Sequence, residues 1–517
     1  MSTLLNGYNL VLTISQDTLN NQFFLLMAEG TIDSRLNIAY APTLPDLVLN
    51  AQVNAPTVQL VMQPASPLQA VFNINFKSGT FTYMDYMLTP PLQTADVSGW
   101  VFSMVVDLTQ MAINSTQPAG LVVSAGAQEQ LGKYVGDPAF SLQALFLNFD
   151  NVNLSTVSVT AADVKMQPSD ARYPWVLSAI QALMANIKQS GNPYILGYHA
   201  SSNDPTQTTP QVPLLASTSM QFVTDQYNYP AGSTDHSKDG LSALCYVTMT
   251  ENLPVPYPDN KVPSFSWNPI PAPAVQGCMF IDNATFNRGY VMGAVLPVLS
   301  QALQSRVAWT QSGNSWSLTD NRNDGDQNDG HGPVVGSDSG ILDIYGLHTN
   351  NRGCTLTLNV AASVGNQLVY DGTGFFYRRL DLYERPFGIW AHDAWTSSNL
   401  PFTFTLKLVA GANGTVTATL VPAQGSAAQD NWANPIVKFT DLIAQLFNAS
   451  LEDQLQKIDN SYTEFEQGQF TQFGNSTAQA FQALSEQLIL PAPKQFYYSN
   501  VGLNSENDVV LEIGYKS

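Results

Sequence analysis

Hydrophobic and polar residues alternate along much of this chain. In the segment AVFNINFKSGTFTYM (70–84), Phe72, Ile74 and Phe76 are separated by polar side chains. This period of two places one face of a strand on a core and the other in water, which is typical of antiparallel sheet. The same pattern recurs in residues 100–108, 145–159, 220–227, 241–250, 354–361, 402–409 and 415–421. We therefore expect a β-dominated α+β fold.

Two segments in the first half of the chain show helical spacing instead. Ser15 is a candidate N-cap, and Gly30 stands where the first of these helices should end. The second helix should start near Pro174 and stop at Gly191. Each carries one apolar stripe, formed by Leu19, Phe23, Leu26 and Met27 in the first, and by Val176, Ile180, Leu183, Met184 and Ile187 in the second.

Further helices are predicted in the second half. One should span residues 283–304 with a bend at Pro297, and its inward positions include Phe286, Tyr290 and Val295. Two more are expected at about 435–455 and 476–488. The helices are therefore few, and strands carry most of the fold.

Two features suggest how the chain is divided. Seven prolines fall between residues 254 and 273, which favours a stiff connector over a helix or a central strand. Beyond it, ISQDTLN (14–20) aligns with IDNATFN (281–287), so a strand end, a capping residue and a helix start recur 267 residues later. We predict a first domain at 1–253, a connector at 254–275 and a second domain at 276–517.

Composition narrows the classes of partner. Only 12% of the 517 residues are charged, and the net charge is -20. Such a surface disfavours nucleic acid or an anionic membrane as a purely electrostatic partner, but it leaves apolar recognition and transient membrane contact open. No basic, apolar and small-residue signal pattern opens the chain, and no apolar run approaches ~20 residues. We expect a soluble protein made in the cytoplasm, with release by another route left open.

The sequence offers no catalytic or metal-binding motif that we recognise. It has no GxSxG elbow, phosphate loop or dinucleotide fingerprint, and its five histidines and three cysteines are scattered. The acidic stretch 320–330 resembles a calcium loop in composition, but Arg322 and His331 occupy two positions where that template needs ligands. We therefore predict no enzyme, no cofactor and no metal, and we favour an acidic surface loop for residues 320–330.

Several stretches together carry a family resemblance. They are LNGYNLVLTISQDTLNNQF at the start, residues 78–108, residues 140–155, NPYILGY (192–198) and the closing residues 489–516. They resemble bacterial tubular lipid-binding (TULIP) proteins, and in particular the accessory proteins encoded beside clostridial neurotoxins and related insecticidal toxins. The resemblance implies two tandem units, each a strongly curved antiparallel sheet wrapped around a long helix, with lipid held between them in some members. It supplies no catalytic motif.

We therefore expect a non-enzymatic protein that binds a lipid or another elongated hydrophobic molecule between helix and sheet. The apolar stripes described above are the candidate groove or core residues: Leu19, Phe23, Leu26, Met27, Val176, Ile180, Leu183, Met184, Ile187, Phe286, Tyr290 and Val295. The alternative is a scaffold of the same fold that binds a protein of a toxin complex and no lipid. A carbohydrate-binding β protein, or a hydrolase with an unrecognised site, is a third hypothesis.

Overall fold

The computed structural model describes residues 4–41, 43–61, 68–150, 152, 154–161, 164–203, 215–259, 261–303, 305–322, 334–338, 342–384, 389–424, 428–433, 470–492 and 496–515. Contacts divide the chain into two compact units. Unit 1 comprises residues 1–286, 410–415 and 479–517, and unit 2 comprises residues 287–409 and 416–478. Strands dominate and pair antiparallel, so the predicted β-dominated class is confirmed. The tandem arrangement, the wrapped helices and the predicted domain boundaries stay predictions.

One sheet of unit 1 is built symmetrically about two paired strands. Its order is β12 (Ser217–Asp225), β13 (Ala243–Thr250), β1 (Leu10–Ser15), β14 (Gly277–Ile281), β25 (Val509–Tyr515) and β24 (Phe496–Leu503). In the central pair, Leu10 lies opposite Ile281 and Ile14 opposite Gly277. The two strands whose ends the sequence repeat aligns are therefore neighbours in one sheet, and because they run antiparallel the aligned ends lie at opposite ends of the pair.

A helical segment follows each of these central strands. The hydroxyl of Ser15 accepts the Thr18 N–H at 3.1 Å and caps α1 (Gln16–Ala28), as the sequence predicts. Asp282 accepts the Thr285 N–H at 3.0 Å in the same way. The segment that it opens is a π-helix, η3 (Ala284–Val291), which continues as α4 (Met292–Ala302) with Pro297 inside it.

The Pro-rich segment 254–275 belongs to the core of unit 1. Phe265 and Ile270 are buried among Val11, Cys245 and Phe280 on one face of the sheet around β1 and β14. The Trp267 indole N–H donates to the Leu4 carbonyl at 3.0 Å. The segment therefore covers this face of the sheet and contributes side chains to the core of unit 1.

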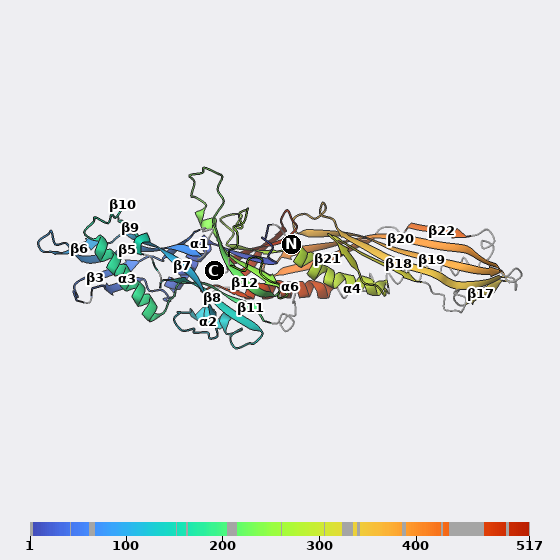
Figure 1. Cartoon of the computed structure of the whole chain (residues 1–517), viewed down its shortest axis with the longest axis horizontal. Coiled ribbons are helices and arrows are strands. Elements are labelled where there is room, and N and C mark those ends of the chain that lie inside the picture. The colour runs from blue at the N-terminus through green and yellow to red at the C-terminus, as the bar shows by residue number, and fades with distance from the viewer. Residues whose placement is uncertain are drawn as a thin grey trace. The chain divides into compact units, whose positions relative to one another are not determined.

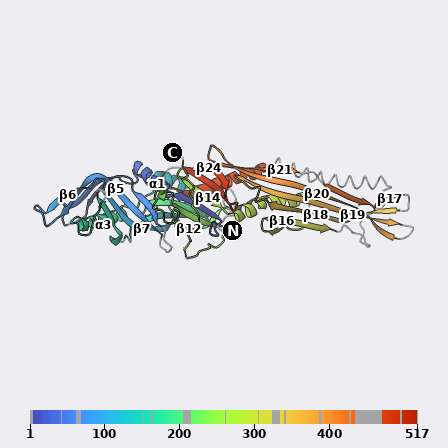
Figure 2. The same cartoon turned by 90° about the horizontal axis from the view of Figure 1, so that it is seen from above.

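The other sheet of unit 1 is long and strongly curled, as Figure 2 shows. Its order is β2 (Arg35–Ala39), β3 (Val48–Val53), β5 (Gln69–Met84), β7 (Val101–Ile113), β8 (Phe140–Asn148), β11 (Ile195–Ser202) and β23 (Leu488–Ile489). Shorter strands add to it: β4 (Thr57–Val61) and β6 (Leu92–Asp96) pair with β5, β9 (Ser158–Ala161) pairs with β7, and β10 (Val164–Lys165) pairs with β9.

Helices line this curled sheet. In both views α3 (Tyr173–Ser190) runs along the part of the sheet formed by β5 and β7 (Figures 1 and 2). α2 (Ala125–Leu131) packs Ala127 and Leu131 against Ala144 and Ile195 of β8 and β11. α1 contacts β4, where the Asn20 side chain accepts the Val58 N–H at 2.7 Å and donates to the Val58 carbonyl at 3.2 Å.

Unit 2 contains a sheet of long strands. Its order is β15 (Thr310–Ser312), β16 (Ser315–Arg322), β18 (Leu342–Leu358), β19 (Gln367–Glu384), β20 (Ile389–Ala410) and β21 (Val416–Gln424), with β17 (Val334–Asp338) on β18 and β22 (Ala428–Ala433) on β20. Alternate residues such as Leu356, Tyr370 and Phe404 are buried. The Tyr370 hydroxyl donates to the Asn287 side chain, so this buried face meets the helical segment η3.

Two predictions fall wholly or partly outside the described residues. The helix expected at 435–455 lies outside them, as do residues 323–330 of the calcium-like stretch; its first residues, 320–322, end β16. The helix expected at 476–488 is found as α6 (Phe470–Glu486). No helix in the described part of the chain is both long and apolar enough to cross a membrane.

Candidate functional site

A cavity of about 370 Å³ lies in unit 1 between the last turns of α3 and the curled sheet. Its walls come from β7, from β8 and the residues after it, from residues 119–121 and from α3. The side chains that matter below are Met111, Phe146, Phe149, Met184, Ile187 and, at the polar end, Asn148, Asp150, Lys188 and Asn192. The volume lies within the ~300–1,000 Å³ of typical small-ligand sites.

The sequence of α3 provides an apolar stripe that packs on the sheet and residues that mark the start and the end of the helix. Pro174 stands in its first turn, where a missing N–H costs nothing. Val176, Ile180 and Leu183 are buried along the stripe. Gly191 has a φ of 94°, a conformation that glycine adopts without strain, and it ends the helix beside the cavity.

Asn192 fastens the cavity wall to the end of α3. Its side chain donates to the Leu147 carbonyl at 2.6 Å and accepts the Tyr194 N–H at 2.9 Å. Its backbone N–H donates to the Gly120 carbonyl at 2.9 Å, and its carbonyl accepts the Val122 N–H at 3.0 Å. The side chain therefore joins β8 to the residue before β11, and the backbone of the same residue holds the 120–122 wall.

An aromatic cluster lies beside the cavity. Phe149 packs edge-on against Phe72 and Tyr194, with ring centroids 5.2 and 5.5 Å apart, and Tyr194 packs against Phe23 of α1 at 6.0 Å. Burial, with a contribution from Asp33, raises the pKa of Tyr194 to about 12. The phenol is therefore neutral at physiological pH.

The opposite end of the cavity is polar. The Lys188 ammonium lies 2.8 Å from the Asp150 carboxylate, and both side chains are mostly exposed. An exposed pair of this kind contributes only ~0–1 kcal/mol to stability. The cavity thus joins apolar walls to a solvent-facing rim with one cation and one anion.

The structure brings some of the predicted groove residues together and leaves others apart. Met184 and Ile187 line the cavity, whereas Val176, Ile180 and Leu183 lie further along α3 and do not. On α1, Leu19, Phe23 and Leu26 are buried in unit 1, and Met27 is half-buried.

The candidates from the second half lie elsewhere. Phe286 stacks on Phe481 with ring centroids 6.0 Å apart, the Tyr290 hydroxyl lies 3.0 Å from that of Thr477, and Val295 is buried in α4. Met111, Phe146 and Phe149 of the cavity were not predicted from the sequence. The run ALFL (144–147) was a usable signal, because it breaks the alternation and gives β8 apolar side chains on both faces.

A second, smaller cavity of about 170 Å³ lies in unit 1 beside α2 and α6. Lys133 and Glu486 line it, with nitrogen and oxygen 3.7 Å apart, together with Tyr134 and Phe496. Its volume is below the usual range for ligand sites. We therefore treat the larger cavity as the candidate site.

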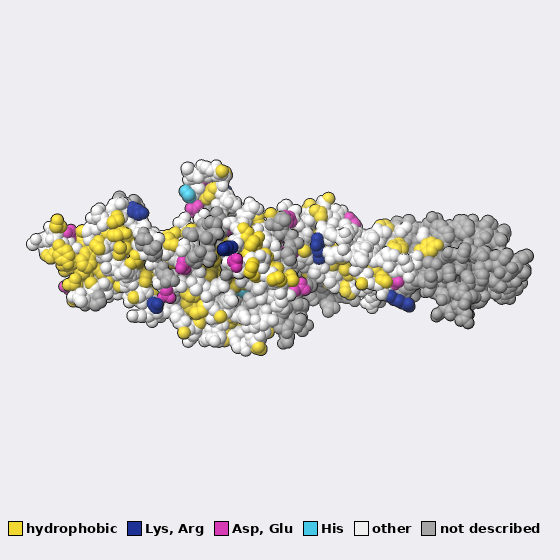
Figure 3. All heavy atoms as spheres, viewed as in Figure 1, with side chains coloured by type: hydrophobic (Ala, Val, Ile, Leu, Met, Phe, Trp, Pro, Cys, Tyr) yellow, Lys and Arg dark blue, Asp and Glu magenta, His cyan; other side chains and the backbone are white. Residues whose placement is uncertain are grey.

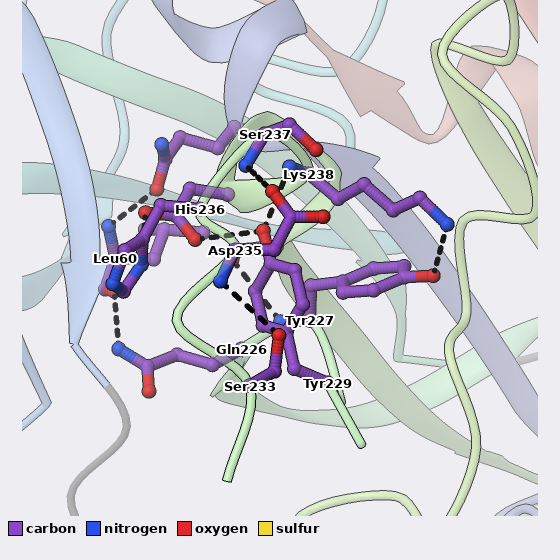
Figure 4. A network of polar contacts seen from close by, with 12 residues as sticks. Leu60, Gln226, Tyr227, Tyr229, Ser233, Asp235, His236, Ser237 and Lys238 are labelled. Carbon is purple, nitrogen blue, oxygen red and sulfur yellow. Dashed lines mark hydrogen bonds and ion pairs between the residues drawn. The ribbon is translucent and has the colours of Figure 1, made fainter. Parts of the chain in front are cut away.

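A network of titratable side chains gathers in residues 226–239 (Figure 4). Lys238 donates from its ammonium to the Tyr227 hydroxyl at 3.1 Å, and its backbone N–H donates to the Tyr229 hydroxyl at 2.7 Å. Tyr229 donates in turn to Asp239 at 3.0 Å. The hydrogen bond from Lys238 to Tyr227 raises the pKa of the ammonium. These bonds fix an exposed turn and place no nucleophile beside a base.

Buried groups elsewhere are poor candidates for chemistry. Cys245, Cys278 and Cys354 are buried and form no disulfide, and burial raises the pKa of each thiol. Burial lowers the pKa of His199 to about 3. In the described part of the chain, no three His, Cys, Asp or Glu side chains gather as metal ligands would.

Comparison with known proteins yields a fold likeness. No family model and no curated relative matches the chain. The solved structure of P47 from Clostridium botulinum A2 superposes with a TM-score of 0.52 at 12% identity, covering 99% of this chain and 98% of that one. P47 from C. botulinum E1 gives 0.50 at 13% identity over 99% of both. A lipopolysaccharide-binding protein reaches only 0.29 at 11% identity, covering 98% of this chain and 99% of that one.

The likeness to the two P47 structures spans almost the whole chain, so the chain shares their fold. This supports the resemblance to toxin-accessory proteins at the level of fold. A likeness at 12–13% identity carries no ligand or activity with it, and a TM-score of 0.29 carries no argument. Function therefore has to be argued from the site.

Proposed function

We propose that the protein is a non-enzymatic binder of a lipid, and that one apolar chain of the lipid enters the cavity between α3 and the curled sheet. The observation that carries this proposal is the cavity of about 370 Å³, with Met111, Phe146 and Met184 among its walls. Each methylene buried there gains ~0.8 kcal/mol. About ten such groups would supply the ~8 kcal/mol that micromolar binding requires.

The polar rim suggests which end of the lipid stays in water. Lys188 and Asp150 present one cation and one anion at the mouth, and Asn148 adds an amide. A zwitterionic head group can pair with both charges. We therefore expect a single-chain zwitterionic lipid such as lysophosphatidylcholine to bind more tightly than a fatty acid of the same length.

We also propose that the protein catalyses no reaction at this cavity. In the described residues the titratable groups near the cavity are an exposed ion pair and a neutral tyrosine, which gives no nucleophile with an adjacent base. A protein of a toxin complex as a further partner is a proposal that rests on the resemblance and on the P47-like fold. Co-purification from the producing organism tests that partner.

The lipid proposal is tested by native mass spectrometry. The protein as purified is examined for bound lipid, and the delipidated protein is then titrated with lysophosphatidylcholine. Ala185 is exposed on α3 and lines the cavity, so Ala185→Trp places an indole at the mouth without disturbing the core. We expect this substitution to weaken lipid binding at least about tenfold, because the chain can no longer enter.

Gln189→Trp is the matched control. Gln189 is exposed on the same helix and does not line the cavity, so lipid binding should not change. Wild-type protein that carries no lipid and accepts none contradicts the proposal and leaves the protein-binding scaffold. If Ala185→Trp binds lipid as tightly as wild type, the ligand binds at another part of the protein.

A further inference from the structure

The turn between β5 and β6 exposes several large apolar side chains. Met87 is 93% exposed and Tyr86 72% exposed, and Leu88, Pro90, Pro91 and Leu92 are exposed beside them. Figure 3 shows hydrophobic side chains gathered over the part of the sheet that carries β6. We call residues 85–92 the apolar turn. Single exposed apolar residues are ordinary, but a cluster of them at a projecting turn indicates a binding surface.

Several backbone N–H groups of the apolar turn are hydrogen-bonded within the turn itself. The Asp85 N–H donates to the Pro91 carbonyl at 2.8 Å, and the Leu88 N–H donates to the Asp85 carbonyl at 3.1 Å. The Met87 N–H donates to the Asp85 carboxylate at 3.0 Å. Pro90 and Pro91 have no N–H to satisfy. Pairing of these three N–H groups lowers the cost of placing the turn in an apolar phase, because an unpaired donor there costs several kcal/mol.

The turn is held firmly by its neighbours. Where β5 ends, the Met84 carbonyl accepts the Trp175 indole N–H from the first turns of α3 at 2.8 Å. Nearby, Tyr40 stacks on Phe81 with ring centroids 5.3 Å apart. The helix that supports the apolar turn at one end therefore lines the 370 Å³ cavity near its other end.

The charges around the turn limit what it can contact. Asp85 is the only charged residue between 83 and 93, and Asp46 belongs to the adjacent turn between β2 and β3. Arg172, which acts electrostatically on Tyr83, is paired with Asp170 at 2.5 Å and lies over the Trp100 ring. Because Asp85 and Asp46 give this end of the sheet negative charge with no adjacent free cation among the described residues named here, an anionic surface is repelled more than a zwitterionic one.

We propose that the apolar turn inserts into the interface of a zwitterionic phospholipid bilayer. Met87 and Leu88 would enter the acyl boundary, and Tyr86 would sit at the head-group level, where tyrosine is favoured. This inference goes beyond ligand binding in the cavity, because it concerns a different surface and needs no bound lipid. Together the two sites would let α3 join a membrane contact to a lipid cavity.

The test uses the full chain and vesicles. Because all three native cysteines are buried, Thr89→Cys can be labelled selectively with an environment-sensitive dye. We expect a blue shift with phosphatidylcholine vesicles and co-sedimentation of the protein. Adding about a third of phosphatidylglycerol at low salt should weaken binding. The double substitution Met87→Asp with Leu88→Asp should weaken partitioning at least about tenfold, since two charges must leave water.

Val364→Asp is the matched control, because Val364 is an apolar residue 65% exposed in another turn. Its partitioning should equal that of wild type. No shift with phosphatidylcholine, unchanged binding by the double variant, or binding only to anionic vesicles each overturns the inference. Lysophosphatidylcholine titration of the double variant in vesicle-free solution separates the two proposals, since the cavity should still fill.

Discussion

At the scale of single residues, Asp225 combines burial with an incomplete set of hydrogen bonds. It lies at the end of β12 and is almost wholly buried, beside Cys245. One oxygen accepts the Phe265 N–H at 3.2 Å, and the other has no hydrogen-bond partner. Burial disfavours the carboxylate and raises the pKa from its ordinary value of 3.8 to about 7. The folded protein therefore keeps a proton that the unfolded chain loses.

This raised pKa predicts how stability depends on pH. Below pH 3.8 both states hold the proton, and between about 4 and 7 only the folded state does. Raising the pH across that window therefore lowers the free energy of unfolding contributed by Asp225. Asp225→Asn removes the charge, so its stabilising effect should be larger at pH 8 than at pH 5 by about 1–3 kcal/mol. Urea unfolding at the two pH values measures this difference.

A control comes from an exposed carboxylate of the same unit. Asp259 is exposed, and Asp259→Asn should change stability equally little at pH 5 and pH 8. An Asp225→Asn variant that is less stable than wild type at pH 8 would show that the carboxylate is stabilised in the fold, contrary to this argument.

At the scale of elements, the sequence predicted the helices better than the cavity. Ser15, Gly30, Pro174 and Gly191 mark helix ends through local chemistry, and the structure has all four at the ends of α1 and α3. The cavity is lined by residues from four separate segments of the chain. Met111, Phe146 and Phe149 come close to α3 only because the sheet is curled. Periodicity reports which face of an element is apolar; it carries no information on whether the space beyond that face is filled.

A substitution of Asn192 tests how much its side chain stabilises the cavity wall. Asn192→Ala leaves the Leu147 carbonyl and the Tyr194 N–H without their side-chain partner. Since each buried group left unpaired costs ~1–3 kcal/mol, we expect a loss of about 2–4 kcal/mol in the free energy of unfolding. Loosening the tie between β8 and the residue before β11 should also weaken lysophosphatidylcholine binding. Urea unfolding and native mass spectrometry report the two effects.

Asn186→Ala serves as the comparison, because Asn186 is exposed on α3. We expect its stability within about 0.5 kcal/mol of wild type. If Asn192→Ala is as stable as wild type, the two side-chain hydrogen bonds of Asn192 do not stabilise the junction between β8 and the residue before β11.

At the scale of the molecule, the sheet around β1 and β14 gives the sequence repeat a structural setting. The strands β1 and β14 pair antiparallel with each other, and each continues into a capped helical segment. β13 flanks one and β25 the other. The repeat was readable because caps and strand ends are local signals. The pairing of the two copies was not, since no local pattern states which strands will meet across 267 residues.

This arrangement predicts which parts of the chain fold alone. A fragment 1–253 lacks β14, so β1 becomes an edge strand, and it also lacks Phe265 and Ile270 from the core. An exposed edge and an uncovered core face favour aggregation. We therefore expect fragment 1–253 to show no cooperative unfolding transition by circular dichroism and to aggregate in size-exclusion chromatography.

A spliced chain that keeps the two long segments of unit 1 should behave differently from fragment 1–253. Joining 1–286 to 479–517 through a short Gly/Ser linker keeps β14, β24, β25 and the 254–275 cover. The join is short because the Phe286 and Phe481 rings lie 6.0 Å apart. We expect this chain to unfold cooperatively and still to bind lysophosphatidylcholine, since the whole cavity lies within it. If fragment 1–253 folds and the spliced chain does not, the domain boundaries predicted from the sequence are correct, and the symmetric sheet forms only after each half has folded.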